Sequence, residues 1–260
     1  MTHAWFAASP VPRVLAHRGF VSAQSAADGV VENSFAAVAA AHAIGATYVE
    51  SDCHLTADGE VVLFHDADLH RVTGDPRPIA SVRLAELEDL MAERGGLITL
   101  RQALESFPTV RFNLDVKADA AAAPAGRLVA AHAQRVLLTS FSDVRRRRAL
   151  AAAHHEGGEP ATSGGRSTIA RIVAAVAAHL PGAAHSAWDD VDALQIPERQ
   201  GRLRLLTPRL LDAAHERGVE VHVWTVDDPA EMARLLDLGV DGIVTDRADA
   251  GLDLLDRRGR

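Results

Sequence analysis

The chain has 260 residues, of which 48% are hydrophobic, and a formal net charge of −8 at pH 7. This length allows one large domain with its own core, expected over residues 1–260. The acidic balance argues against nucleic acid as a partner, and no apolar run approaches the ~20 residues that span a bilayer. Cys53 is the only cysteine, so an internal disulfide is excluded. We expect a cytoplasmic protein without a leader or stable membrane insertion.

The predicted elements alternate between strand and helix along the chain. Strands are expected at residues 14–16, 48–53, 110–116, 136–139, 160–163, 193–196, 219–226 and 242–245, with a short return strand at 61–64. Helices are expected at residues 34–44, 84–91, 99–106, 143–153, 167–180, 207–218 and 228–238. Thr207-Pro208 and Asp228-Pro229 each supply an N-cap residue and a first-turn proline. The polar residues 253–260 are expected to fray.

Eight strands in this alternation indicate an α/β fold with a parallel sheet. Eight strand–helix units in about 250 residues favour a closed (β/α)8 TIM barrel in a single domain. The alternative is an open doubly wound sheet. However, His17-Arg18-Gly19 follows the first strand, where that fold would place a glycine-rich phosphate-binding sequence. In a barrel, the functional residues gather at the C-terminal ends of the strands.

Two acidic residues in the second strand are the centre of the predicted site. Glu50 and Asp52 lie two residues apart, so their carboxylates point to the same face. Unpaired charges are costly inside a barrel, and a carboxylate pair suits a hard divalent cation. We therefore interpret both residues as metal ligands. Asp115 in the next main strand is the natural third ligand, unless it forms an ion pair with Lys117.

Two of the 13 histidines end strands beside a charged residue. His17 precedes Arg18, and His65 precedes Asp66. Because histidine titrates near neutral pH, we interpret the pair as the general acid and base of catalysis. The alternative is that both are ordinary core or surface histidines.

Arg18 and Lys117 are the cations expected beside these acids. The forked guanidinium of Arg18 suits a phosphate oxygen, and its alternative role is an ion pair with Glu50. Lys117 is the only lysine in the chain. A compact ammonium group fits a tight site, which favours substrate binding by Lys117 over a solvated surface position.

Two further features are open to more than one interpretation. Trp224 ends an apolar strand, where it suits a substrate-binding wall and the core equally well. The run from Arg145 to Arg148 distributes four positive charges around a helix, and we expect it to be solvated.

Motifs along nearly the whole chain resemble those of glycerophosphodiester phosphodiesterases. The matching segments are His17-Arg18-Gly19, Glu32-Asn33-Ser34, the long block 50–66, and residues 223–226 and 239–246. The resemblance implies a TIM barrel that uses Mg²⁺ or Ca²⁺ to hydrolyse glycerophosphodiesters to sn-glycerol 3-phosphate and an alcohol. It implies that His17 and His65 are the acid–base pair, Arg18 a phosphate ligand, and Glu50 and Asp52 metal ligands. Glu32 and Asn33 match a motif near the site.

One position departs from the family pattern. Asp115-Val116-Lys117 stands where Glu-x-Lys is commoner, so the shorter carboxylate ligates the cation either directly or through water. Two alternative functions are a lysophospholipase D-type enzyme with a lysolipid substrate, and a barrel that binds a phosphorylated ligand without turnover. The nucleophile is either water or the neighbouring glycerol hydroxyl, the latter by way of a cyclic phosphate.

Overall fold

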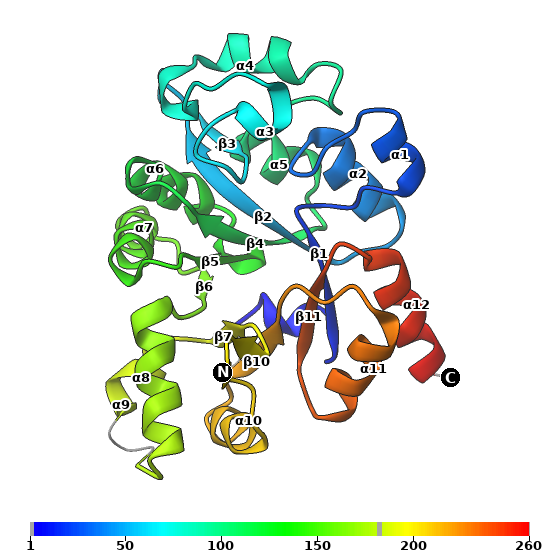
Figure 1. Ribbon diagram of the computed structural model, residues 1–260. Helices are drawn as coiled ribbons and strands as arrows, with labels where there is room; N and C mark the ends of the chain where they lie inside the picture. The colour runs from blue at the N-terminus through cyan, green and yellow to red at the C-terminus, as the bar shows by residue number, and fades with distance from the viewer. Residues whose placement is uncertain (1–2, 181–183, 260) are drawn as a thin grey trace.

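The computed structural model describes residues 3–180 and 184–259, and its centre is a parallel barrel (Figure 1). The barrel strands are β1 (Arg13–His17), β2 (Tyr48–Leu55), β4 (Arg111–Val116), β5 (Val136–Thr139), β6 (Ala161–Thr162), β7 (Ala193–Ile196), β10 (Glu220–Val223) and β11 (Gly242–Thr245). They pair in the order β6-β5-β4-β2-β1-β11-β10-β7. An isolated parallel bridge between Ser163 and Ala193 joins the two ends. The predicted (β/α)8 barrel is confirmed.

Helices surround the barrel, and the remaining strands form two short extensions. The α-helices are α1 (Ala23–Ala27), α2 (Phe35–Ala43), α3 (His70–Thr73), α4 (Leu84–Met91), α5 (Leu100–Ser106), α6 (Asp119–Ala130), α7 (Asp143–His155), α8 (Arg166–Ala177), α9 (His185–Trp188), α10 (Pro208–His215), α11 (Pro229–Asp237) and α12 (Ala248–Arg258). Strand β3 (Val61–Leu63) pairs with β2, whereas β8 (Arg199–Gln200) and β9 (Leu203–Arg204) form a separate hairpin. None of the helices in the described ranges combines the length and apolar character needed to cross a bilayer.

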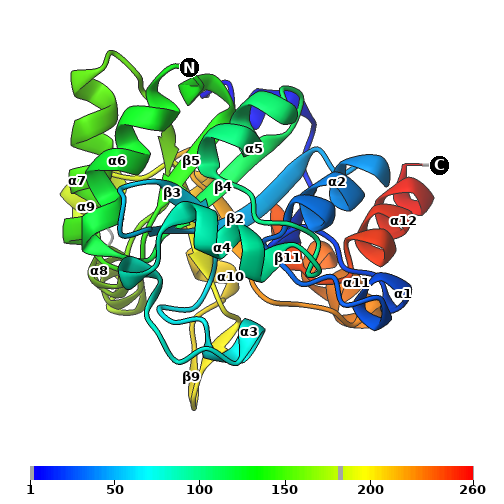
Figure 2. The same cartoon turned by 90° about the horizontal axis from the view of Figure 1, so that it is seen from above.

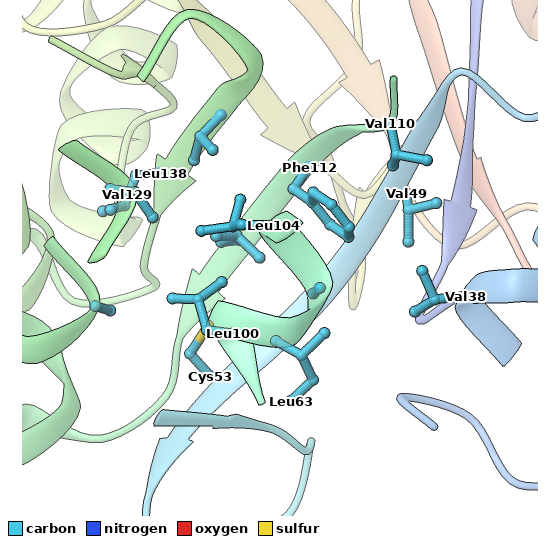
Figure 3. Packing of buried hydrophobic residues seen from close by; sticks show 14 of the residues in the cluster. Val38, Val49, Cys53, Leu63, Leu100, Leu104, Val110, Phe112, Val129 and Leu138 are labelled. Atoms are coloured by element: carbon cyan, nitrogen blue, oxygen red, sulfur yellow. The ribbon is translucent and has the colours of Figure 1, made fainter. Parts of the chain in front are cut away.

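Apolar residues cover the outside of the barrel and fill its N-terminal end. Outside, Phe112 of β4, Cys53 of β2 and Leu104 of α5 belong to the cluster between sheet and helices (Figure 3). At the N-terminal end, Trp5 is fully buried, and its ring lies edge-on to that of Tyr48 at 4.7 Å between centroids. Its indole N–H donates to the Phe112 carbonyl oxygen at 3.0 Å. The opposite, C-terminal end is therefore the one available for a substrate site.

The structure corrects two expectations. Of the residues 253–260 expected to fray, 253–258 belong to α12, which packs against β1 and β11, and residue 260 lies outside the described residues. The run of four arginines is only partly solvated: Arg147 and Arg148 are exposed, but Arg146 is fully buried and forms ion pairs with Asp143, at 3.4 Å, and with Asp190. A helix turns roughly 100° per residue, so at least one of four consecutive side chains faces the sheet. Here it is Arg146, which pairs with the two carboxylates.

Asp143 fastens the start of α7 to the start of α8. Its carboxylate accepts hydrogen bonds from the backbone N–H groups of Gly165, Ser167 and Thr168 and from the Thr168 hydroxyl. Burial alone would raise the pKa of Asp143, but the hydrogen bonds from Ser167 and Thr168 hold it at about 2. The charged carboxylate therefore stabilises the fold.

We expect Asp143→Asn to remove a stability increment that depends on pH. Because the pKa is lower in the folded state, the increment is complete above the unfolded value near 4 and disappears as pH falls towards 2. It amounts to about 2 kcal/mol at neutral pH. Urea unfolding from neutral to acid pH measures it. The free energies of unfolding of the wild-type enzyme and Asp143→Asn should converge at acid pH. A difference that stays constant from neutral to acid pH would contradict the role assigned to the charged carboxylate.

Candidate active site

The polar residues singled out in the sequence lie at the C-terminal ends of β1, β2 and β4 or just beyond them. Helices α1 and α3 lie at this end of the barrel (Figure 2). The register of β1 and β2 pairs His17 with Glu50, and the register of β2 and β4 pairs Asp52 with Asp115. Lys117 directly follows β4. Neighbouring strands in this register bring their side chains to one level of the barrel.

Asp52 is held between two cations. It is 1% exposed, and its carboxylate lies 2.9 Å from Lys117 Nζ and 3.1 Å from Arg18 Nε. Lys117 Nζ also lies 2.7 Å from Asp115, so the ion pair proposed as an alternative for Asp115 is present. Burial lowers the pKa of Lys117, but the charges of Asp115 and Asp52 outweigh it and raise the pKa. The ammonium group is therefore fixed in its charged form.

Glu50 has less compensation than Asp52. It is 8% exposed, accepts a hydrogen bond from the Arg18 backbone N–H at 3.2 Å, and lies 3.9 Å from His17 Nε2. The Arg18 guanidinium pairs with Asp52 and Glu32, so the Arg18–Glu50 ion pair that was the alternative role of Arg18 is replaced by this backbone contact. Burial and the neighbouring Asp52 raise the pKa of Glu50 to about 8. The cluster thus has a deficit of positive charge around Glu50.

Asp115 has one oxygen without a partner. Its Oδ2 contacts Lys117, whereas Oδ1 is buried and accepts no hydrogen bond from any described residue. Burial raises the pKa of Asp115. An orphaned carboxylate oxygen is costly in the interior, and a cation would remove that cost. In this arrangement Lys117 lies between Asp52 and Asp115, and no group of three His, Cys, Asp or Glu side chains among residues 3–180 and 184–259 surrounds one ion position.

Each candidate catalytic histidine has a carboxylate on Nδ1. His17 Nδ1 lies 2.7 Å from Asp246 Oδ1, and His65 Nδ1 lies 2.6 Å from Asp66 Oδ1. Burial lowers the pKa of His17, but the hydrogen bond with Asp246 raises it, and the net shift is upward. Because Nδ1 is engaged, Nε2 is the nitrogen of each ring that is available to a substrate.

Ion pairs connect the His65 side of the site to Arg18. Asp66 lies 2.6 Å from Arg71 Nε, Arg71 lies 2.6 Å from Glu32, and Glu32 lies 3.5 Å from Arg18. Glu32 therefore links Arg71 to Arg18 at the edge of the site. Such a network fixes side chains whose rotamers would otherwise be free.

Two further side chains hold parts of this cluster in place. Asn33 Nδ2 donates to Asp52 Oδ2 at 3.0 Å, and His54 Nε2 lies 3.2 Å from the backbone carbonyl oxygen of His65. Burial lowers the pKa of His54, so this ring is suited to remain neutral. Asn33 thus orients an acid, and His54 anchors the segment that carries His65.

An aromatic pair borders the charged cluster. The rings of Trp224 and Phe141 meet edge to face at 5.6 Å between centroids, and Lys117 Nζ lies 5.2 Å from the Phe141 centroid. Trp224 is half-buried and packs against the barrel interior, as the core interpretation predicts. Phe141 is 40% exposed and was not identified from the sequence.

Asp66, Asp246 and Arg71 were not assigned roles from the sequence either. Asp66 follows His65 directly, and a histidine beside a carboxylate is itself a signal for such a pair. Asp246 is 229 residues from His17. Only the closure of the barrel, which sets β1 beside β11, could have indicated it.

Residues 17–250 match the model of the glycerophosphoryl diester phosphodiesterase family. A relative from Mycobacterium tuberculosis, named a probable glycerophosphodiester phosphodiesterase, is 36% identical over 94% of this chain and 91% of its own. A lysophospholipase D from Rattus norvegicus is 24% identical over 90% of this chain and 83% of its own. The solved structure of a glycerophosphodiester phosphodiesterase from Thermotoga maritima has a TM-score of 0.71 at 26% identity, covering 97% of this chain and 99% of that one. The chain is therefore an enzyme of the glycerophosphoryl diester phosphodiesterase family.

Proposed function

We propose that this enzyme hydrolyses water-soluble glycerophosphodiesters to sn-glycerol 3-phosphate and an alcohol, with the help of a divalent cation. The observation that carries the proposal is the convergence of two carboxylate-paired histidines on one cluster of buried acids and cations. A phosphodiester is an anion whose cleavage needs charge neutralisation and two proton transfers, and this cluster contains groups for both.

The acids suit Mg²⁺ or Ca²⁺ by their chemistry. Glu50, Asp52 and Asp115 offer the oxygen ligands that hard cations prefer. The orphaned Asp115 oxygen and the raised pKa of Glu50 mark the place where positive charge is lacking. When bound, such a cation supplies Lewis-acid stabilisation to a phosphate oxygen. We propose these three residues as its ligands, with the short Asp115 bound directly or through water.

The remaining residues have complementary roles. Arg18 and Lys117 neutralise charge that develops on the phosphoryl oxygens. Of His17 and His65, one removes the proton from the attacking water or glycerol hydroxyl, and the other protonates the alcohol as it leaves. Trp224 forms a wall for the substrate. The free, buried Cys53 supports the proposal that the enzyme works in the cytoplasm.

Neither alternative function is favoured. The relative with 36% identity is named a phosphodiesterase, whereas the lysophospholipase D reaches 24%. A binding protein without turnover would not need both histidines, each with its own carboxylate.

The proposal predicts cation-dependent release of glycerol 3-phosphate from glycerophosphocholine, glycerophosphoethanolamine or glycerophosphoglycerol. The purified enzyme is treated with EDTA and then supplied with Mg²⁺, Ca²⁺ or Mn²⁺, and the product is measured by a coupled dehydrogenase assay. We expect EDTA to abolish release and one of the cations to restore it. Full activity in EDTA would contradict the role of the cation, and turnover of lysophosphatidylcholine alone would contradict the substrate class.

A further inference from the structure

Three consecutive loops at the catalytic end of the barrel carry exposed apolar or stacked basic side chains. Phe141 and Val144, where β5 leads into α7, are 40% and 69% exposed. Arg166 begins α8 after β6, and its guanidinium carbon lies 4.9 Å from the centroid of the Phe141 ring. Leu203, in the hairpin that follows β7, is 60% exposed. Single exposed apolar residues are ordinary, but these lie along one arc of the rim.

The β8–β9 hairpin projects from this end of the barrel, as β9 shows in Figure 2. Arg199 pairs with Arg204 and Gln200 with Leu203 across its strands, which join no other sheet. All residues from 199 to 204 are exposed. Leu203 therefore contributes to no core, and an isolated two-stranded hairpin gains little stability from an exposed leucine. Its position is better explained by a partner surface.

The charge of the arc is positive, in contrast to the net charge of −8 of the whole chain. Arg166, Arg199 and Arg202 form no ion pair with any described carboxylate, although 27 such pairs are found elsewhere, including pairs with histidine. The nearby Glu198 is neutralised by Arg204 and Arg234. Uncompensated arginines around exposed apolar side chains are complementary to an anionic interface with an apolar layer beneath it.

We propose that this arc docks the mouth of the barrel on an anionic phospholipid surface. The docking face comprises Phe141, Val144, Arg166, Arg199, Arg202 and Leu203. It is continuous with the substrate site, because Phe141 also contacts Trp224 and Lys117. The inference goes beyond the proposed reaction, since hydrolysis of a soluble diester requires no membrane. Arginines bind phosphate headgroups, while Leu203 and Val144 enter the interface.

The test is co-sedimentation of the full chain with vesicles of phosphatidylcholine alone or mixed equally with phosphatidylglycerol. We expect binding to the mixed vesicles at low salt and its loss at high salt. Each arginine near such a surface contributes roughly fivefold to the partition constant, so Arg199→Gln with Arg202→Gln should weaken binding about 25-fold. Leu203→Ser should weaken it severalfold without changing its salt dependence.

The matched control replaces two arginines away from the rim, Arg127→Gln with Arg257→Gln. Both are exposed in the last turns of α6 and α12, and their replacement changes the net charge equally. Equal losses in the two double variants, or no binding by the wild-type enzyme, would overturn the proposal. The proposal would also fail if sedimentation velocity showed that the wild-type enzyme is a dimer and that the hairpin variant, Arg199→Gln with Arg202→Gln, is a monomer. The partner of this face would then be a second copy of the chain. Hydrolysis of glycerophosphocholine without vesicles should be unchanged in the hairpin variant, which separates docking from the reaction.

Discussion

Replacing His65 by Asn is expected to lower kcat for glycerophosphodiester hydrolysis by about 10²- to 10⁴-fold, the usual contribution of a general acid or base. The side chain of His65 is one-third exposed, and among the described residues its ring makes one polar contact, with Asp66. An asparagine amide retains a donor close to the position of Nδ1, so the fold should be little affected. Steady-state kinetics together with urea unfolding measure the two effects. A near-normal kcat would contradict the catalytic role.

The same substitution at His17 allows the two proton transfers to be separated. A p-nitrophenyl diester has a leaving group that needs no protonation, so the variant that lacks the general acid should recover on this substrate and the variant that lacks the base should not. Asp246→Asn should cost less than His17→Asn, because it disturbs the ring only through its Nδ1 partner. The two substitutions together should cost no more than His17→Asn alone, since they remove one unit.

Much of the fold could be predicted because its signals are local. The apolar strands, the caps at Thr207 and Asp228, and the turn at Gly45 are each encoded within a few residues. The order of eight strand–helix units then leaves few topologies. The carboxylate pair at Glu50 and Asp52 could also be predicted from the sequence, since alternation along a strand places both side chains on one face.

What could not be predicted depends on contacts between distant residues. Helix α6 contains Pro124 and Gly126, which are poor helix formers, and its helical pattern is correspondingly weak. The structure explains the glycine, because a Cβ there would lie 2.1 Å from the carbonyl oxygen of Ala149 in α7. The burial of Arg146 depends on Asp190, 44 residues away. No local pattern reports such a pairing.

Lys117→Met is expected to destabilise the cation-free enzyme by about 3–5 kcal/mol, the cost of breaking a buried ion pair. Methionine approximates the length of the lysine stem but leaves Asp52 with Arg18 alone and removes the ion-pair partner that Asp115 has among the described residues. The two carboxylates are 1% and 5% exposed. Because burial already raises the pKa of Asp115, loss of Lys117 should raise it further. The destabilisation should therefore be larger at alkaline than at acidic pH, where the carboxyl is neutral in both states. Urea unfolding across this range measures it.

The same variant tests the cation ligands independently of catalysis. If Glu50, Asp52 and Asp115 bind the cation, Mg²⁺ or Ca²⁺ should raise the Tm of Lys117→Met more than that of the wild-type enzyme, because the carboxylates no longer share their charge with an ammonium group. Lys117→Arg is the matched control: it keeps the charge and most of the stability, but its broad fork replaces a point charge that lies 2.9 Å and 2.7 Å from two carboxylates. Its kcat should fall, and that of Lys117→Met by about 10²- to 10³-fold. Equal cation effects on all three proteins would show that the cation binds elsewhere.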